Sequence, residues 1–97
     1  MKIFNLGSIN IDHVYRLDHF VQPGETMSCD SVASFAGGKG FNQTIALARA
    51  GTAVAHIGAV GGDGRGLVET LTREGVDVSG VTVEAELPTG HAIIQVM

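Results

Sequence analysis

Residues 34–51 read SFAGGKGFNQTIALARAG. It joins a glycine-rich turn that carries one lysine to a run of small and apolar residues that predicts a helix over 42–50. Gly51 stands where helices commonly end in the left-handed conformation. Because glycine lets the backbone bend sharply and approach a ligand, the stretch predicts a tight turn that opens onto a helix N-terminus.

The rest of the chain alternates short apolar runs with one further helix. Strands are predicted at 3–6, 54–57, 81–83 and 91–96, an antiparallel pair at 13–21 and 27–35, a helix at 67–74 and a loop over the glycine-rich residues 58–66. Strands that alternate with helices predict βαβ units and a parallel sheet. The sequence stops inside an apolar strand, and two helices are too few to cover a sheet of four or more strands. We therefore expect the front part of a longer domain.

Composition narrows the class of protein. The chain has 97 residues, which is enough for one domain, and its net charge of −4 with six scattered lysines and arginines argues against general binding to nucleic acid. The single cysteine cannot form an internal disulfide, which suits a reducing cytoplasm. No apolar run reaches the roughly 20 residues that a membrane span needs. The four histidines lack metal-ligand spacing, so no metal site is expected.

The glycine–lysine stretch does not fit the known phosphate loops. A Walker A loop requires a serine or threonine after the lysine, but Gly40 follows Lys39. The spacing around Gly62 and Gly64 also lacks the third glycine of a dinucleotide-binding loop. Lys39 and Asn42 offer hydrogen-bond donors and an acceptor beside free N–H groups of a helix, which suits a polyhydroxylated ligand such as a sugar. The alternative is a plain glycine turn with a solvated lysine.

A second candidate group follows the first predicted strand. Asn10 and Asp12 are two residues apart, so in an extended chain both side chains point to one face. Ligands of open α/β sheets bind beyond the carboxyl ends of strands, and an amide with a carboxylate can bind adjacent hydroxyls. A strand-ending Asx turn is the alternative. Two such groups in one short chain favour a polyol site.

Four stretches carry a resemblance to a known family. They are GSINID (7–12), GGKGFNQTIALARAG (37–51), IGAVGGDGRG (57–66) and TGHAIIQV (89–96). In this order and spacing they resemble the amino-terminal part of the ribokinase-like (PfkB) carbohydrate kinases, over essentially the whole chain. The resemblance implies a doubly wound, Rossmann-like α/β sheet with a small β-sheet lid. Residues 1–97 would form the amino-terminal part of one kinase domain, with lid strands at about 13–35 and 90–97.

The resemblance also implies an activity. Members of this family transfer the γ-phosphoryl group of ATP to a sugar hydroxymethyl group, with ribose to ribose 5-phosphate as the first expectation and another sugar or a nucleoside as the alternative. Asn10 and Asp12 match the pair that binds sugar hydroxyls. Gly38, Lys39 and Asn42 match a second sugar-binding stretch, and Gly37 with Gly38 matches the hinge on which the lid closes. A homodimer through the lid strands is implied as well.

Half of the expected machinery is missing from these residues. The family's catalytic aspartate and its sites for ATP, Mg²⁺ and a monovalent cation belong to a carboxy-terminal half that is absent here. Asp63 is a tempting base, but the resemblance makes it a scaffold residue of a loop. We therefore expect no catalytic residue in this chain and no activity from it alone. A non-catalytic α/β module that binds a ligand or dimerises is the rival hypothesis.

Overall fold

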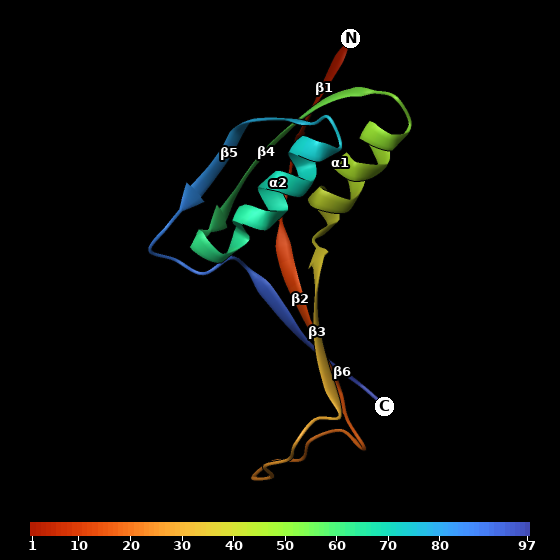
Figure 1. Ribbon diagram of the computed structural model, residues 1–97, viewed down its shortest axis with the longest axis vertical. Coiled ribbons are helices and arrows are strands. Elements are labelled where there is room, and N and C mark those ends of the chain that lie inside the picture. Colours follow the sequence, from red (N-terminus) through yellow and green to blue (C-terminus); the bar gives the residue numbers. More distant parts are fainter.

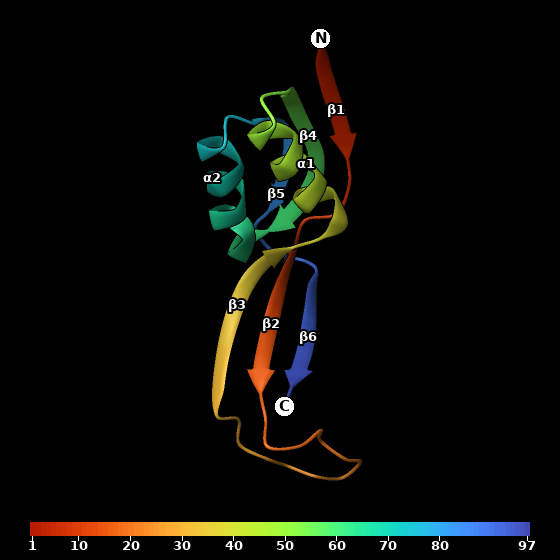
Figure 2. The same ribbon diagram turned by 90° about the vertical axis from the view of Figure 1, so that its right-hand side faces the viewer.

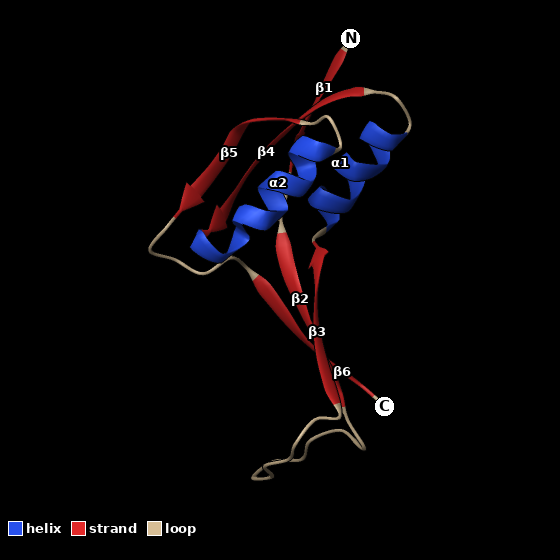
Figure 3. Ribbon diagram, viewed as in Figure 1, coloured by secondary structure: helices blue, strands red, loops and turns tan.

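The computed structural model describes residues 1–97 as two three-stranded sheets placed end to end (Figures 1 and 2). Its principal extents are 52 × 31 × 19 Å. Figure 3 shows the elements by type; in chain order they are β1 (Lys2–Leu6), β2 (Asn10–Arg16), β3 (Ser31–Gly37), α1 (Lys39–Arg49), β4 (Ala53–Gly61), the 3₁₀ turn η1 (Gly62–Gly64), α2 (Arg65–Arg73), β5 (Asp77–Glu84) and β6 (His91–Val96). The predicted α/β fold with a parallel sheet and a second, smaller sheet is confirmed.

The main sheet has the order β1-β4-β5 and is parallel throughout. The chain moves in one direction across it, from β1 through α1 to β4 and through α2 to β5. Since such crossovers are right-handed, both helices lie on one face, as Figure 1 shows. The core between helices and sheet is formed by Ile9, Phe41, Val54, Val60, Leu71 and Val76.

The opposite face of the main sheet has no helix. Phe4 is 66% exposed, Leu6 76% and Ile57 39%, and all three lie on that face. Parallel sheets in proteins normally have both faces covered, so these side chains form an unusually exposed apolar surface. The sheet has three strands, and the prediction of four or more is wrong for these residues.

The small sheet has the order β3-β2-β6. β2 pairs with β3 antiparallel and with β6 parallel, so the predicted antiparallel pair is confirmed. Its position was predicted a few residues too far toward the turn: the pairing runs from Asn10↔Gly37 to Arg16↔Ser31, and residues 17–30 form a long connection. The strands therefore begin and end at the junction with the main sheet.

Two further predictions need correction. The predicted loop over 58–66 is wrong for 58–61, which complete β4 as the central strand between β1 and β5. A Cβ on Gly58 would lie 2.9 Å from the carbonyl oxygen of Gly7, so this glycine serves close packing rather than flexibility. The helix predicted from Asn42 begins at Lys39 instead, because Gly38 already redirects the chain.

The predicted helix ends are confirmed. Gly51 (φ 88°) and Gly75 (φ 83°) are both left-handed. The next N–H after each glycine bonds back into the helix, from Thr52 to the Leu47 carbonyl at 3.1 Å and from Val76 to the Leu71 carbonyl at 3.0 Å. Neither helix is long and apolar enough to cross a membrane.

Candidate functional site

The junction between the sheets is built around a crossing of two glycines. The segment after β1 passes the first turn of α1 so closely that a Cβ on Gly40 would lie 2.6 Å from the Cα of Gly7. The Phe41 N–H donates to the Ser8 carbonyl at 3.0 Å and fixes this contact. The glycine after Lys39 is therefore required by backbone packing. This explains why the stretch has no phosphate-loop register.

Gly38 is the N-cap residue of α1 and takes a backbone conformation that side chains rarely adopt. Its φ is 96°, and a Cβ there would lie 2.6 Å from the Ser8 carbonyl oxygen and 3.2 Å from the Asn10 nitrogen. The Asn42 N–H donates to the Gly38 carbonyl at 3.0 Å. Gly38 thus connects β3 to α1 immediately beside the start of β2.

Asn10 and Asp12 lie in β2, which settles their local structure as extended strand rather than an Asx turn. They share one face, and each side chain rests on a glycine of a neighbouring segment. The Asp12 carboxylate lies over Gly37, and Asn10 Oδ1 lies over Gly90, 3.0 Å from where a Cβ would stand. Neither side chain hydrogen-bonds to another residue of the chain, so both remain available to a ligand.

Lys39 and Asn42 lie in the first turn of α1. Residues three apart lie on the same side of a helix, so these two donors belong to one surface. Both side chains are exposed, and neither has a hydrogen-bond partner within the chain. Lys39 is therefore a helix residue rather than part of the flexible turn.

The predicted site residues thus gather at one junction. Asn10, Asp12, Gly37 and Gly38 are in direct contact or strand register, and Lys39 with Asn42 continue the chain from Gly38. The N-terminal turn of a helix also presents free backbone N–H groups. A carboxylate, two amides, an ammonium group and these N–H groups form a mixed set of donors and acceptors. Chemically, such a set suits a ligand with several hydroxyl groups.

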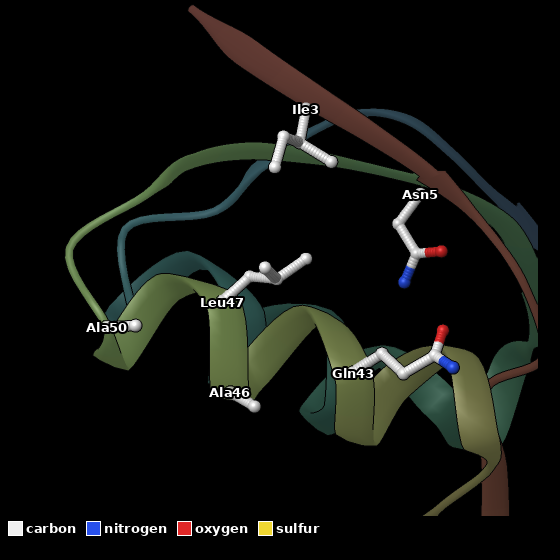
Figure 4. A pocket seen from close by; sticks show the side chains of 6 residues that line it. All are labelled: Ile3, Asn5, Gln43, Ala46, Leu47 and Ala50. Atoms are coloured by element: carbon white, nitrogen blue, oxygen red, sulfur yellow. The ribbon is translucent and has the colours of Figure 1, made fainter.

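An apolar pocket lies elsewhere, between β1 and α1 (Figure 4). Its volume is about 400 Å³, and its lining is Ile3, Asn5, Gln43, Ala46, Leu47 and Ala50. None of the predicted site residues lines it, and the Asn5 amide already donates to Gly40 and Thr44. We assign this pocket to the unpaired edge of the main sheet and not to a ligand.

A network of polar side chains with a buried centre hydrogen-bonds to the junction at Gly7. The sequence alone did not predict it. The Asn5 amide donates to Thr44 Oγ1 (2.9 Å), Thr44 Oγ1 lies 2.7 Å from His56 Nδ1, and His56 Nε2 lies 3.0 Å from the Gly7 carbonyl oxygen. Because a carbonyl can only accept, Nε2 carries a proton. In the neutral ring Nδ1 then accepts from the Thr44 hydroxyl. Thr44 and His56 are fully buried. No local signal marks three residues from β1, α1 and β4 as partners.

A second missed contact involves Asp63. Asp63 Oδ1 accepts from the Thr89 N–H at 2.8 Å and from the Thr89 hydroxyl at 2.6 Å. These bonds, with the hydroxyl bond the larger effect, lower the pKa of the Asp63 carboxyl below its ordinary 3.8. Asp63 is thus bound into the scaffold, as the family resemblance implies, although its partner lies 26 residues away.

Comparison with known proteins places this chain in a family. The pfkB family carbohydrate kinase description matches residues 1–97. A ribokinase from Haemophilus influenzae is 41% identical over 93 residues, which are 94% of this chain and 30% of that protein. The crystal structure of ribokinase from Cryptococcus neoformans in complex with ADP superposes with a TM-score of 0.92 at 42% identity, over 97% of this chain and 30% of that one. The structure of ribokinase from Arabidopsis thaliana complexed with ribose and ATP superposes with a TM-score of 0.84 at 31% identity. The superposition covers 97% of this chain and 31% of that one.

The match is continuous in this chain and partial in its relatives, since the chain spans about 30% of the length of these proteins. The alignments of sequence and of fold extend over nearly the whole chain. The chain belongs to the pfkB family of carbohydrate kinases.

Proposed function

We propose that this chain is the sugar-binding, amino-terminal part of a longer kinase that transfers the γ-phosphoryl group of ATP to a sugar hydroxymethyl group, with ribose as the first candidate. The observation that carries the proposal is the pair of free polar side chains, Asn10 and Asp12, held on glycines beside the first turn of α1. Among the relatives, the Arabidopsis ribokinase was solved with ribose and ATP, which supports both ligands.

Each residue has a proposed part in binding. The Asp12 carboxylate accepts hydrogen bonds from sugar hydroxyls, and bonds to a charged group are worth roughly 1.5–3 kcal/mol. Asn10 and Asn42 can donate and accept, and Lys39 donates from the helix terminus. Gly37 and Gly38 are the proposed hinge on which the small sheet closes as a lid. Such a lid would exclude water from the transfer reaction.

The chemistry of transfer is assigned to the remainder of the protein. Phosphoryl transfer depends on positioning and on stabilising charge around the phosphates. We assign ATP, Mg²⁺ and a monovalent cation to the carboxy-terminal part of the longer protein, as the family resemblance implies. Asp63 is not proposed as the base, since its Oδ1 already accepts two hydrogen bonds from Thr89.

The proposal is tested with the full-length protein. Purified enzyme with ATP, Mg²⁺ and a panel of ribose, fructose and nucleosides reports the acceptor by coupled ADP release. Asp12→Ala is expected to raise the KM for the sugar at least about tenfold and to leave the KM for ATP unchanged. Asp30→Asn, an exposed aspartate of the 17–30 connection, is the matched control. Unchanged sugar affinity in Asp12→Ala contradicts the assignment of this site.

Two associated proposals concern assembly and location. The small sheet exposes Val32 (56%) and Ile93 (68%) on the face opposite Asp12, which supports a homodimer through its strands. Sedimentation of the full-length protein tests the dimer, and Val32→Ser together with Ile93→Ser is expected to yield monomers. Because the proposed reaction consumes ATP, we place the protein in the cytoplasm.

The rival function is a free-standing, non-catalytic module. It requires the 97 residues to melt cooperatively alone, to be monodisperse and to bind a ligand without ATP chemistry. The uncovered face with Phe4 and Leu6 argues against it. Differential scanning calorimetry of the isolated chain distinguishes the two: a sharp transition with a defined oligomer favours the module.

A further inference from the structure

Three segments connect the two sheets. Two of them, residues 7–9 and Gly38, meet at the glycine crossing, where backbone bonds and one side-chain bond, from His56 Nε2 to the Gly7 carbonyl, hold them. The third, residues 85–90, leads from β5 to β6. It differs from the other two because one of its own side chains, that of Thr89, binds it to the main sheet.

The centre of this third connection is Thr89, which is 1% exposed. Its N–H and its hydroxyl both donate to Asp63 Oδ1, at 2.8 and 2.6 Å. The same hydroxyl oxygen accepts from the Gly61 N–H at 2.9 Å. Two residues before Thr89, the Leu87 carbonyl accepts from the Gly62 N–H at 3.1 Å. Four hydrogen bonds thus fix the connection to the end of β4 and the 3₁₀ turn.

The three glycines of the GGDG segment (61–64) allow this contact because they have no side chain. A Cβ on Gly62 would lie 2.9 Å from the Ala85 carbonyl oxygen. A Cβ on Gly61 would collide with the Leu87 carbonyl oxygen, and one on Gly64 with the Thr89 hydroxyl. The connection therefore lies directly on the glycine backbone. This requirement accounts for a motif that sequence reasoning took for a loop.

The fixed connection leads directly to Asn10, one of the residues proposed to bind the sugar. Gly90 follows Thr89, and its carbonyl accepts from the Ile11 N–H at 3.0 Å. The side-chain oxygen of Asn10 rests on Gly90, as described above. Any shift of Thr89 would move Gly90 against Asn10 and would disturb the pairing of β6 with β2, which begins at Ile11↔His91.

We propose that Asp63 and Thr89 are positioning residues that form a fixed pivot for the small sheet and hold Asn10 in place through Gly90. The Gly37–Gly38 side of the junction is the bending side, and the Thr89 side is the anchored one. This inference rests on the proposed function, since the consequence it names is the affinity for the sugar acceptor. Asp63 acts through Thr89 and touches neither substrate nor the reacting atoms.

The test uses a graded series in the full-length enzyme. Thr89→Val keeps the shape and removes the hydroxyl, Thr89→Ser restores the hydroxyl, and Asp63→Ala removes the acceptor. We expect Thr89→Val and Asp63→Ala to raise the KM for ribose about tenfold with an unchanged KM for ATP, and Thr89→Ser to stay within about twofold of wild type. Glu86→Gln is the control, because Glu86 lies in the same connection, is exposed and has no side-chain partner. Asp63→Asn, which keeps an acceptor oxygen, replaces Asp63→Ala or Thr89→Val if either fails to fold, and we expect about a threefold rise in KM.

A second measurement separates this inference from the proposed function. Amide hydrogen exchange at Ile11 and Gly61 reports the pivot without any substrate. Faster exchange at both amides in Thr89→Val, with Thr89→Ser unchanged, supports the pivot. Unaltered exchange overturns it, and so does a lowered melting temperature with a wild-type KM for ribose, because that pattern marks a purely structural role. If the wild-type enzyme phosphorylates no sugar, the proposed function fails. The role of Asp63 and Thr89 in positioning a sugar-binding residue is then overturned as well, whereas hydrogen exchange still reports whether they hold the small sheet.

Discussion

The carboxylate of Asp12 occupies the space above Gly37. A Cβ on Gly37 would stand 2.6 Å from Asp12 Oδ2 and 2.9 Å from its Cγ. The two glycines of the proposed hinge are therefore required for different reasons. Gly38 needs its left-handed backbone with φ 96°, whereas Gly37 is needed because Asp12 lies against it.

The first prediction concerns Gly37→Ala, because this variant tests the position of the Asp12 carboxylate separately from the bending of the chain at Gly38. The added methyl group has to displace the Asp12 carboxylate, since sub-3 Å contacts are not tolerated. We expect the KM for the sugar to rise about tenfold while the KM for ATP stays constant, as for loss of a charged hydrogen bond. Gly66→Ala is the matched control, because a Cβ there meets open space. A wild-type sugar KM in Gly37→Ala contradicts the proposed role of Asp12.

Gly40→Ala is predicted to act on stability rather than on binding alone. Its Cβ would lie 2.6 Å from Gly7 backbone atoms, which cannot move aside as a side-chain end can. We expect a loss of about 3 kcal/mol or more in the free energy of unfolding, at the upper end for overpacking. Chemical denaturation of the full-length protein measures it. Gly66→Ala in α2 should instead stabilise by about 0.5–1 kcal/mol, as expected for glycine replaced in a helix.

The parts of this fold that follow from sequence are those with local causes. Gly51 and Gly75 end their helices because each supplies a left-handed residue, and the spacing of Asn10 and Asp12 places both on one face of a strand. The chain positions of these residues were enough to predict the candidate site. By contrast, the run from Gly58 to Gly61 reads as a loop until β1 and β5 are seen on both sides of it.

What sequence reasoning missed are contacts between distant residues. Asp63 and Thr89 are 26 positions apart, and His56 meets Gly7 across 49. A lone histidine or aspartate carries no sign of its partner, because the partner is set by how the sheet brings segments together. The resemblance suggested that Asp63 is a scaffold residue, but only the structure shows which bonds make it one.

The Asn5–Thr44–His56 network predicts that substitutions at Thr44 and His56 have non-additive effects on the free energy of unfolding. His56→Phe leaves the proton of the Thr44 hydroxyl without an acceptor and the Gly7 carbonyl without its donor, and each such buried group costs about 1–3 kcal/mol. Thr44→Val alone leaves His56 Nδ1 without its hydrogen-bond donor. The double variant removes both ends of the Thr44–His56 bond, so we expect it to be less destabilised than the sum of the single variants by about 1 kcal/mol or more. Thr72→Val, at an exposed position of α2, is the control for removing a helix hydroxyl. Strict additivity in denaturation experiments contradicts the network.

The last prediction concerns pH and the pair formed by Lys2 and Asp77. The Lys2 ammonium lies 2.6 Å from Asp77 Oδ2, between β1 and the start of β5, with both groups partly exposed. This bond, followed by bonds from the Ser79 N–H and hydroxyl, holds the pKa of the Asp77 carboxyl well below its ordinary 3.8. A depressed carboxyl pKa contributes stability that is fully present above the ordinary value and is lost as the pH falls through the depressed one.

Lys2→Met removes the larger of these effects and leaves the bonds from Ser79. In NMR titration the pKa of Asp77 should rise toward 3.8 and remain below it. The melting temperature of wild type should exceed that of the variant near pH 7, and the difference should shrink as the pH falls below about 4. Because the pair is exposed, 1 M salt should reduce the same difference at pH 7, whereas Ser79→Ala should show a salt-independent loss. A melting difference that persists unchanged at low pH would assign the effect of Lys2 to its aliphatic packing instead of its charge.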